Sequence, residues 1–423
     1  MPRLTPFRAL RYRRDAGSLS DLLAPPYDVI DPEHAHTLRE RHPANSVRLV
    51  LPEGEAPGRY EAAARTLSDW IEAGILELDP DPTVTVYRQT FEGPNGTVTR
   101  HALFAALDLS PFGSGEVLPH ERTHSGPKRD RLALTLATLT QLSPVFLSSR
   151  DADLALYGKL REVAAAAPES VAETDDGVSH AVWRVADPDT CAALCEAAGA
   201  GPLLIADGHH RYETALEVER LLGADQPAAA QVLACVVSGA DPGLRIHPTH
   251  RTITVAPPGH ADVGWADLLS DRFTLERLDP ADPLDLAAVA EAAGTPVLVT
   301  RSGAWRLRPT PEAARAAHLD EADLSIPPAV LDRLVVEGIL GTDADTAAHD
   351  GWLAYYRDAA AAVAAAGARG AAFLLPAVGQ DSVWKVTGLG RRLPPKSTYY
   401  EPKVPSGLLF RPLADRRGST GEG

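Results

Sequence analysis

Residues 202–216 read PLLIADGHHRYETAL, and they contain the sharpest change from strand to helix in the chain. Pro202 to Ala206 is a short apolar run typical of a buried strand, and Tyr212 and Ala215 recur at helical spacing after it. Gly208 stands between the two elements, where the lack of a side chain lets the backbone approach a ligand closely. The stretch therefore predicts a strand–turn–helix junction.

The polar residues of this junction favour an anion site. Backbone N–H groups in the first turn of a helix, at His209 and His210 here, have no partner inside the helix, and Arg211 adds a planar guanidinium group suited to phosphate. Asp207 either caps the helix or holds a metal ion, and the histidines donate hydrogen bonds or shuttle protons. A helix cap with two surface histidines is the alternative interpretation. We favour function, because a cap does not require two histidines and an arginine.

A second polar stretch, LPHERTHSGPKRDR at residues 118–131, precedes an apolar-periodic helix predicted for residues 132–142. We assign His120 and Glu121 to catalysis, with Glu121 as a general base or magnesium carboxylate. Lys128, Arg129 and Arg131 follow closely and are candidates for binding phosphate oxygens. Residues 120–124 also match H-E-x-x-H formally, but the flanking prolines leave too little helix for a zinc site. A solvated charged loop is the structural alternative. We predict that the His120/Glu121 loop and the Asp207–Arg211 turn face one cleft.

Periodicity along the rest of the chain predicts an α+β (mixed α/β) fold. It indicates helices at residues 59–73 and 352–366 and a β-hairpin formed by residues 83–91 and 98–109. We expect three parts: an α/β core at 1–250 that carries both polar stretches, an α+β lobe at 251–375, and an extended C-terminal segment with a polar tail at 376–423. Lys396 and Lys403 in that segment would present cations to an anion, although surface lysines are the commoner explanation.

Composition limits the classes of function. The chain has 423 residues, 41 Lys+Arg and 57 Asp+Glu, and therefore a net charge of −16, which disfavours nucleic acid and anionic membranes as partners. No apolar run approaches the ~20 residues that span a bilayer, and the three cysteines offer no disulfide framework. We expect a cytoplasmic protein with a small-molecule substrate. No sequence feature specifies its oligomeric state.

Five blocks in the chain resemble the signature of the domain of unknown function 1015 family. They are PPYDVI (25–30), PHERT (119–123), ADGHHRYETAL (206–216), HPTHR (247–251) and PPKSTYYEPKVPSGL (394–408). The D-G-H-x-R junction is also similar to the phosphate-binding motif of the ParB/sulfiredoxin-like superfamily, which includes a free-serine kinase. That similarity implies a phosphate-binding core in which Gly208, His210 and Arg211 hold nucleotide phosphates. His209 stands where sulfiredoxins have their catalytic cysteine, which disfavours sulfinic-acid reduction.

These observations lead to one functional hypothesis and its alternatives. We expect a nucleotide-dependent phosphotransferase that acts on a small hydroxyl-bearing metabolite such as serine. ATP or ADP would be the donor, and Asp207 would help to bind Mg²⁺. A ParB-like nucleotide-binding switch without transfer chemistry, or a phosphoester hydrolase, would use the same residues. The chain has neither a Walker A loop nor a dinucleotide fingerprint.

Overall fold

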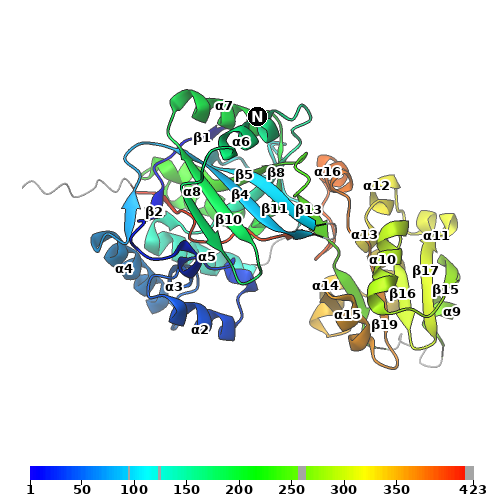
Figure 1. Cartoon of the computed structure of the whole chain (residues 1–423). Helices are drawn as coiled ribbons and strands as arrows, with labels where there is room; N and C mark the ends of the chain where they lie inside the picture. Colours follow the sequence, from blue (N-terminus) through cyan, green and yellow to red (C-terminus); the bar gives the residue numbers. More distant parts are fainter. Residues whose placement is uncertain (94–95, 122–124, 256–262, 415–423) are drawn as a thin grey trace, which may run out of the picture. The chain divides into compact units, whose positions relative to one another are not determined.

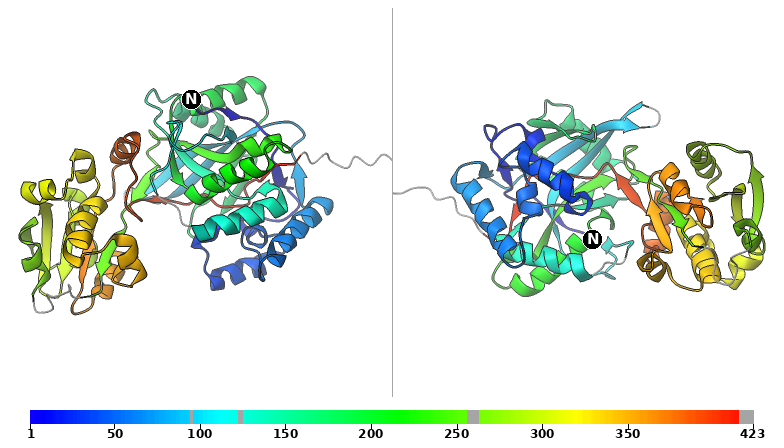
Figure 2. Two further views of the ribbon diagram at one scale, coloured as in Figure 1. Left: turned by 180° about the vertical axis from the view of Figure 1, so that it is seen from behind. Right: turned by 90° about the horizontal axis from the view of Figure 1, so that it is seen from below.

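The computed structural model describes residues 1–93, 96–121, 125–255 and 263–414, and the chain divides into two compact units (Figures 1 and 2). The first unit comprises Met1–Pro119, Thr123–Leu244 and Pro402–Gly423, and the second comprises His120–Arg122 and Arg245–Glu401. The boundary between the two units lies between residues 244 and 245, whereas the sequence led us to expect it between residues 250 and 251. The expected C-terminal segment, 376–423, is shared between the two units.

A nine-stranded mixed sheet forms the centre of the first unit. Its strands lie in the order β6 (Val117–Leu118), β11 (Leu203–Asp207), β8 (Val145–Ser149), β12 (Gln231–Ser238), β5 (Gly96–Asp108), β4 (Val84–Gly93), β10 (Ser179–Val185) and β9 (Ser170–Glu173), with β1 (Leu4–Thr5) also paired to β5. The pairs β6–β11 and β8–β12 are parallel and the others antiparallel. The β4–β5 pair confirms the predicted hairpin.

One face of this sheet packs against helices of the same unit. Successive strand residues point to opposite faces, so Leu103, Ala105 and Leu107 of β5 all enter the same apolar core. The helices α6 (Ala155–Ala164) and α7 (Pro188–Ala198) supply Leu160 and Leu194 to that core. Burying a leucine fully contributes about 1.5–3 kcal/mol. These contacts hold the sheet, and with it the end of β11, in a fixed position.

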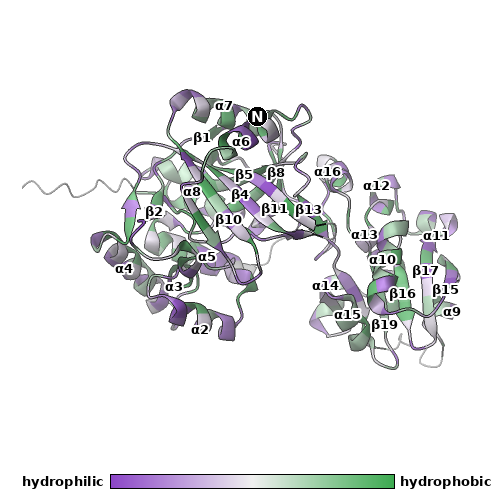
Figure 3. Ribbon diagram, viewed as in Figure 1, coloured by the Kyte–Doolittle hydropathy of each residue, from purple (hydrophilic) through white to green (hydrophobic). Residues whose placement is uncertain are grey.

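The remaining elements of the first unit surround the sheet. They are α1 (Leu19–Leu22), a 3₁₀ turn (Tyr27–Val29), α2 (Pro32–Arg41), α3 (Val47–Val50), α4 (Gly58–Glu72), α5 (Ser125–Thr138), α8 (His209–Leu222), a second 3₁₀ turn (Pro227–Ala230), and the short paired strands β2 (Leu10–Tyr12), β3 (Leu76–Leu78), β7 (Thr140–Gln141) and β21 (Arg411–Pro412). Figure 3 shows hydrophilic residues along α2 and α4. The helix expected at 59–73 is confirmed as α4. The polar stretch expected to be a loop as far as residue 131 is helical from Ser125 onward.

The second unit contains a six-stranded antiparallel sheet. Its order is β15 (Phe273–Leu278), β17 (Gly303–Pro309), β16 (Val297–Thr300), β19 (Ala371–Leu374), β14 (His250–Ile253) and β18 (Leu353–Tyr356), and β13 (Arg245–His247) pairs separately with β20 (Tyr399–Glu401). Its helices are α9 (Trp265–Leu269), α10 (Pro283–Ala293), α11 (Pro311–Ala316), α12 (Glu321–Leu324), α13 (Pro327–Leu331), a π-helical segment (Asp332–Leu340), α14 (Ala344–His349), α15 (Ala359–Ala366) and α16 (Gln380–Gly388). The helix expected at 352–366 was wrong over residues 352–358, because β18 pairs with β14 there and α15 begins only at Ala359.

The two units together confirm the expected mixed α+β fold class. Among the helices of the described residues, none has the length and apolar character needed to cross a membrane.

Candidate functional site

The predicted strand–turn–helix junction is present in the first unit. Leu203 to Ala206 are buried in β11, Gly208 has φ +96° as the N-cap residue of α8, and Tyr212 N–H donates to the Gly208 carbonyl oxygen at 3.0 Å. A positive φ strains a residue with a Cβ atom. Glycine at this position therefore lets the chain turn directly from the strand into the helix, whose first-turn N–H groups face away from the helix body.

Arg211 and Lys403 both bind the carboxylate of Asp207. Arg211 Nη2 pairs with Asp207 Oδ2, and Lys403 Nζ donates to Asp207 Oδ1 at 2.5 Å. Arg211 Nη1 also donates to the Pro144 carbonyl oxygen. The exposed fractions of the three charged side chains are 10% for Arg211, 16% for Asp207 and 17% for Lys403. The junction thus holds two nearly buried cations around one carboxylate.

Mutual attraction in this cluster favours the charged forms of Asp207 and Arg211. Burial alone would raise the pKa of Asp207, but Lys403 and Arg211 outweigh it and hold that pKa well below its usual range. Burial alone would lower the pKa of Arg211, but the Asp207 carboxylate, with a smaller contribution from Asp28, raises it. Asp207 and Arg211 are therefore both ionised at neutral pH.

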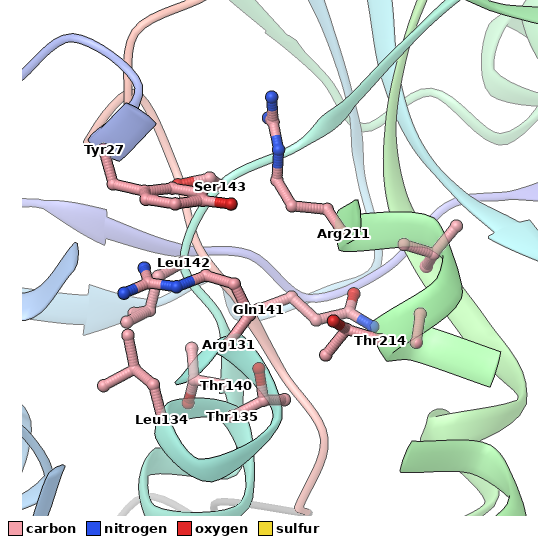
Figure 4. Close-up of a pocket in the computed structure, with 12 residues that line it drawn as sticks. Tyr27, Arg131, Leu134, Thr135, Thr140, Gln141, Leu142, Ser143, Arg211 and Thr214 are labelled. Atoms are coloured by element: carbon pink, nitrogen blue, oxygen red, sulfur yellow. The ribbon is translucent and has the colours of Figure 1, made fainter. Parts of the chain in front are cut away.

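A pocket lies beside the first turns of α8 (Figure 4). In Figure 4, Arg211 and Thr214 of α8 face Tyr27 and Arg131 across it. The Arg131 guanidinium carbon lies 4.0 Å from the centroid of the Tyr27 ring, a cation–π contact. The volume of the pocket is about 50 Å³, which admits a small polar group and lies below the ~300 Å³ of sites that hold drug-sized ligands.

The hydroxyl of Thr214 points to a polar occupant of this pocket. Thr214 is 5% exposed, and its Oγ1 makes no hydrogen bond to any residue of the described ranges. An unsatisfied buried hydroxyl costs about 1–3 kcal/mol. Burial raises the pKa of the Tyr27 hydroxyl, and the positive charge of Arg211 offsets part of that increase.

The other predicted residues of the first unit differ in their surroundings. Lys128 Nζ donates to Glu213 Oε2 of α8 at 2.6 Å, so Lys128 lies beside the start of that helix. Arg129 is exposed, His209 is buried and His210 is half-buried. The ion pair between α5 and α8 holds Lys128 beside the start of α8, and the phosphate-binding role of Lys128 and Arg129 stays a prediction.

His120 and Glu121 belong to the second unit. His120 is 1% exposed, its Nε2 lies 2.7 Å from Thr398 Oγ1, and its carbonyl oxygen accepts from Leu393 N–H at 2.8 Å. Glu121 Oε1 lies 4.0 Å from His120 Nε2. Burial raises the pKa of Tyr400, and the negative charge of Glu121 adds to the effect. His124 lies outside the described residues. The predicted single cleft involves both units, and it stays a prediction.

Two features of the site were not assigned from the sequence. The contact between Tyr27 and Arg131 was not predicted, since Tyr27 was noted only as part of a sequence block and Arg131 only as a candidate for phosphate oxygens. Lys403 was explained as a surface lysine. The available signal was the position of Tyr27 after Pro25-Pro26, which fixes an extended backbone before the 3₁₀ turn. No local pattern identifies Lys403, since 196 residues separate it from Asp207.

Comparison with protein families gives a match to the family described as "Protein of unknown function (DUF1015)" over residues 4–332. The chain belongs to this family. The matched range includes the PPYDVI, PHERT, DGHHR and HPTHR blocks and ends before the block at 394–408 that contains Lys403. Among curated proteins, none matches the sequence.

Solved structures similar to this family member share little sequence with it. A mutant free serine kinase in complex with ADP is 12% identical, with 73% of this chain and 92% of that chain covered and a TM-score of 0.36. A conserved hypothetical protein from Pyrococcus furiosus is 14% identical (72% and 93% covered, TM-score 0.35). SbnI with a C-terminal truncation, from Staphylococcus aureus, is 11% identical, with 73% of this chain and 87% of that chain covered and a TM-score of 0.37. The ParB/sulfiredoxin-like assignment of the junction stays a prediction.

Proposed function

We propose that this protein is a nucleotide-dependent phosphotransferase that acts on a small hydroxyl-bearing metabolite, with serine as one candidate acceptor. The observation that carries the proposal is the junction at Gly208. There, the N-terminal turn of a 14-residue helix and the guanidinium group of Arg211 lie together at the end of a buried strand. Helix N-termini and arginine forks are the groups that proteins use to bind phosphate.

The phosphate site would include further residues of the first unit. The N–H groups at His209 and His210 and the side chain of Arg211 would hold the nucleotide phosphates. Lys128 and Arg129, on the first turns of α5, would add positive charge. Because phosphoryl transfer depends mainly on positioning and charge stabilisation, such a set of donors supplies what the reaction needs.

The transfer step requires a group that removes the acceptor proton. In the proposal, Glu121 takes the proton of the acceptor hydroxyl, with His120 and His209 as further acid–base groups. The acceptor oxygen forms a bond to the terminal phosphorus of ATP or ADP, the bond from that phosphorus to the bridging oxygen breaks, and ADP or AMP leaves. This role requires Glu121 to reach the phosphate bound at Arg211.

The arrangement around Asp207 does not favour the predicted binding of Mg²⁺ by this residue. Both oxygens of Asp207 are engaged by cations, so Asp207 does not offer Mg²⁺ a free carboxylate in this arrangement. The metal role of Asp207 stays a prediction that nucleotide titrations with and without Mg²⁺ test directly.

A transfer screen tests the function. Purified protein is incubated with ATP or ADP and Mg²⁺ together with a panel of small hydroxyl compounds, and products are followed by ³¹P NMR. The proposal predicts a new phosphomonoester resonance that grows as nucleotide is consumed. Release of inorganic phosphate without acceptor phosphorylation would instead indicate a hydrolase. Nucleotide binding without any turnover would indicate a switch.

A further inference from the structure

Lys403 reaches the candidate site from a C-terminal segment whose backbone is firmly held. The Lys403 carbonyl oxygen accepts from Gln89 Nε2 at 2.9 Å, and the carbonyl oxygen of the preceding Pro402 accepts from the buried Arg100 guanidinium. Three residues further on, Ser406 exchanges backbone hydrogen bonds with Ala24. The segment is thus anchored to both β4 and β5, and it presents the Lys403 side chain to the end of β11.

The two cations at Asp207 are close enough to share one anion. Arg211 contacts one oxygen of the carboxylate and Lys403 contacts the other. Adjacent oxygens of a phosphate group are spaced much like the two oxygens of a carboxylate. Groups that share Asp207 can therefore share a phosphate, with Arg211 as a planar fork and Lys403 as a mobile point charge.

We infer that Lys403 is an anion-binding residue of this site and contacts the same phosphate group as Arg211. Asp207 acts as a positioning residue that holds both cations near the N-terminus of α8 before the ligand binds. The ligand class is a compound with an oligophosphate group. This inference rests on the proposed phosphate site, and it extends that site to a residue outside the range matched by the family.

Metal-free inorganic pyrophosphate is the probe that isolates this role. Its affinity is measured by calorimetry for the parent protein, Lys403→Met, Lys403→Arg and a control, Lys385→Met. Lys385 forms an ion pair with Glu321 at 2.7 Å in the second unit. We expect Lys403→Met to weaken pyrophosphate binding about 10- to 100-fold and to lower its salt dependence, since a charge-assisted contact is lost. The affinity of Lys403→Arg for pyrophosphate should stay within about threefold of that of the parent. The affinity of Lys385→Met should equal that of the parent.

A purely structural ion pair would give a different result. In that case Lys403→Met would lower the melting temperature while pyrophosphate bound as tightly as to the parent, and the inference would be overturned. If Lys403→Met does not fold, lysine labelling of the parent protein replaces it. Pyrophosphate should then slow the modification of Lys403 and leave that of Lys385 unchanged, and an unchanged rate at Lys403 would count against the inference.

The inference and the proposed function fail in distinguishable ways. If the parent binds pyrophosphate through Lys403 but transfers no phosphoryl group in the screen, the phosphotransferase proposal fails and the role of Lys403 stands. If phosphoryl transfer is found and Lys403→Met binds pyrophosphate normally, only the inference fails. A parent protein that binds neither pyrophosphate nor nucleotide contradicts both.

Discussion

A Cβ atom placed on Gly208 would lie 2.9 Å from Cζ of Arg211, closer than real Cβ contacts allow. The guanidinium group therefore occupies the space that a side chain at position 208 would need. Glycine is required at position 208 for two reasons: the Arg211 side chain fills the adjacent space, and the φ of +96° lies in the region that favours glycine. The glycine and the arginine of the D-G-H-H-R sequence depend on one another.

This relationship predicts that Gly208→Ala is destabilising and displaces Arg211. We expect a loss of about 1–3 kcal/mol in the free energy of unfolding, because the backbone is strained and the guanidinium group must move. Chemical denaturation measures the loss. Gly158→Ala is the matched control, since Gly158 lies inside α6 and a Cβ atom placed on it would meet nothing within 4 Å, and alanine there should stabilise by up to about 1 kcal/mol. Equal effects at the two glycines would contradict the account.

The Asp207 cluster predicts a specific dependence of stability on pH. Lys403 and Arg211 hold the pKa of Asp207 below the ordinary value of about 3.9. A carboxylate with a depressed pKa in the folded state contributes stability that is complete above its unfolded pKa and is lost as the pH falls through the folded pKa. Asp207→Asn should therefore cost about 3 kcal/mol at pH 7, and the difference from the parent should narrow below about pH 4.

Urea denaturation of both proteins between pH 7 and pH 2 measures that difference. Asp69→Asn on the exposed face of α4 serves as a control for replacement of a surface carboxylate. The account is contradicted if the penalty of Asp207→Asn is the same at pH 3 as at pH 7, because the ion pairs would then contribute nothing to the folded state.

Glu121→Gln tests the assignment of the general base. The amide keeps the size of the side chain but cannot accept the proton of the acceptor hydroxyl. Turnover should therefore fall by about 10² to 10⁴ while nucleotide affinity stays nearly unchanged. Steady-state kinetics and calorimetry on the same preparation separate the two quantities. A variant with parental turnover would remove Glu121 from the mechanism and would also remove the reason to expect a single cleft.

The sequence predicts the junction itself because its signals are local. The buried run of β11, Gly208 and the periodicity of α8 all lie within fifteen residues. The start of α5 was placed too late because Ser125 to Arg131 are mostly polar and include a proline. In the structure, partners on other elements satisfy this polar turn, since Lys128 pairs with Glu213 and Asp130 with Arg59.

Contacts between distant parts of the chain account for what the sequence does not reveal. Lys403 resembles any surface lysine until the fold brings it to Asp207, and Arg131 becomes a pocket residue only when it stacks on Tyr27. The strand at Leu353–Tyr356 was missed for the same reason, because its pairing with β14 is specified a hundred residues away in the chain.

Calorimetric titration of ADP and ATP into the parent and Arg211→Ala measures the contribution of Arg211 to nucleotide binding. The account predicts that the parent binds at least one of the two nucleotides. Arg211→Ala should then lose about 1.5–3 kcal/mol of binding free energy, the value expected for a charge-assisted contact. If Arg211→Ala binds the nucleotide as tightly as the parent, the phosphate site lies elsewhere and the junction at Gly208 is a helix cap.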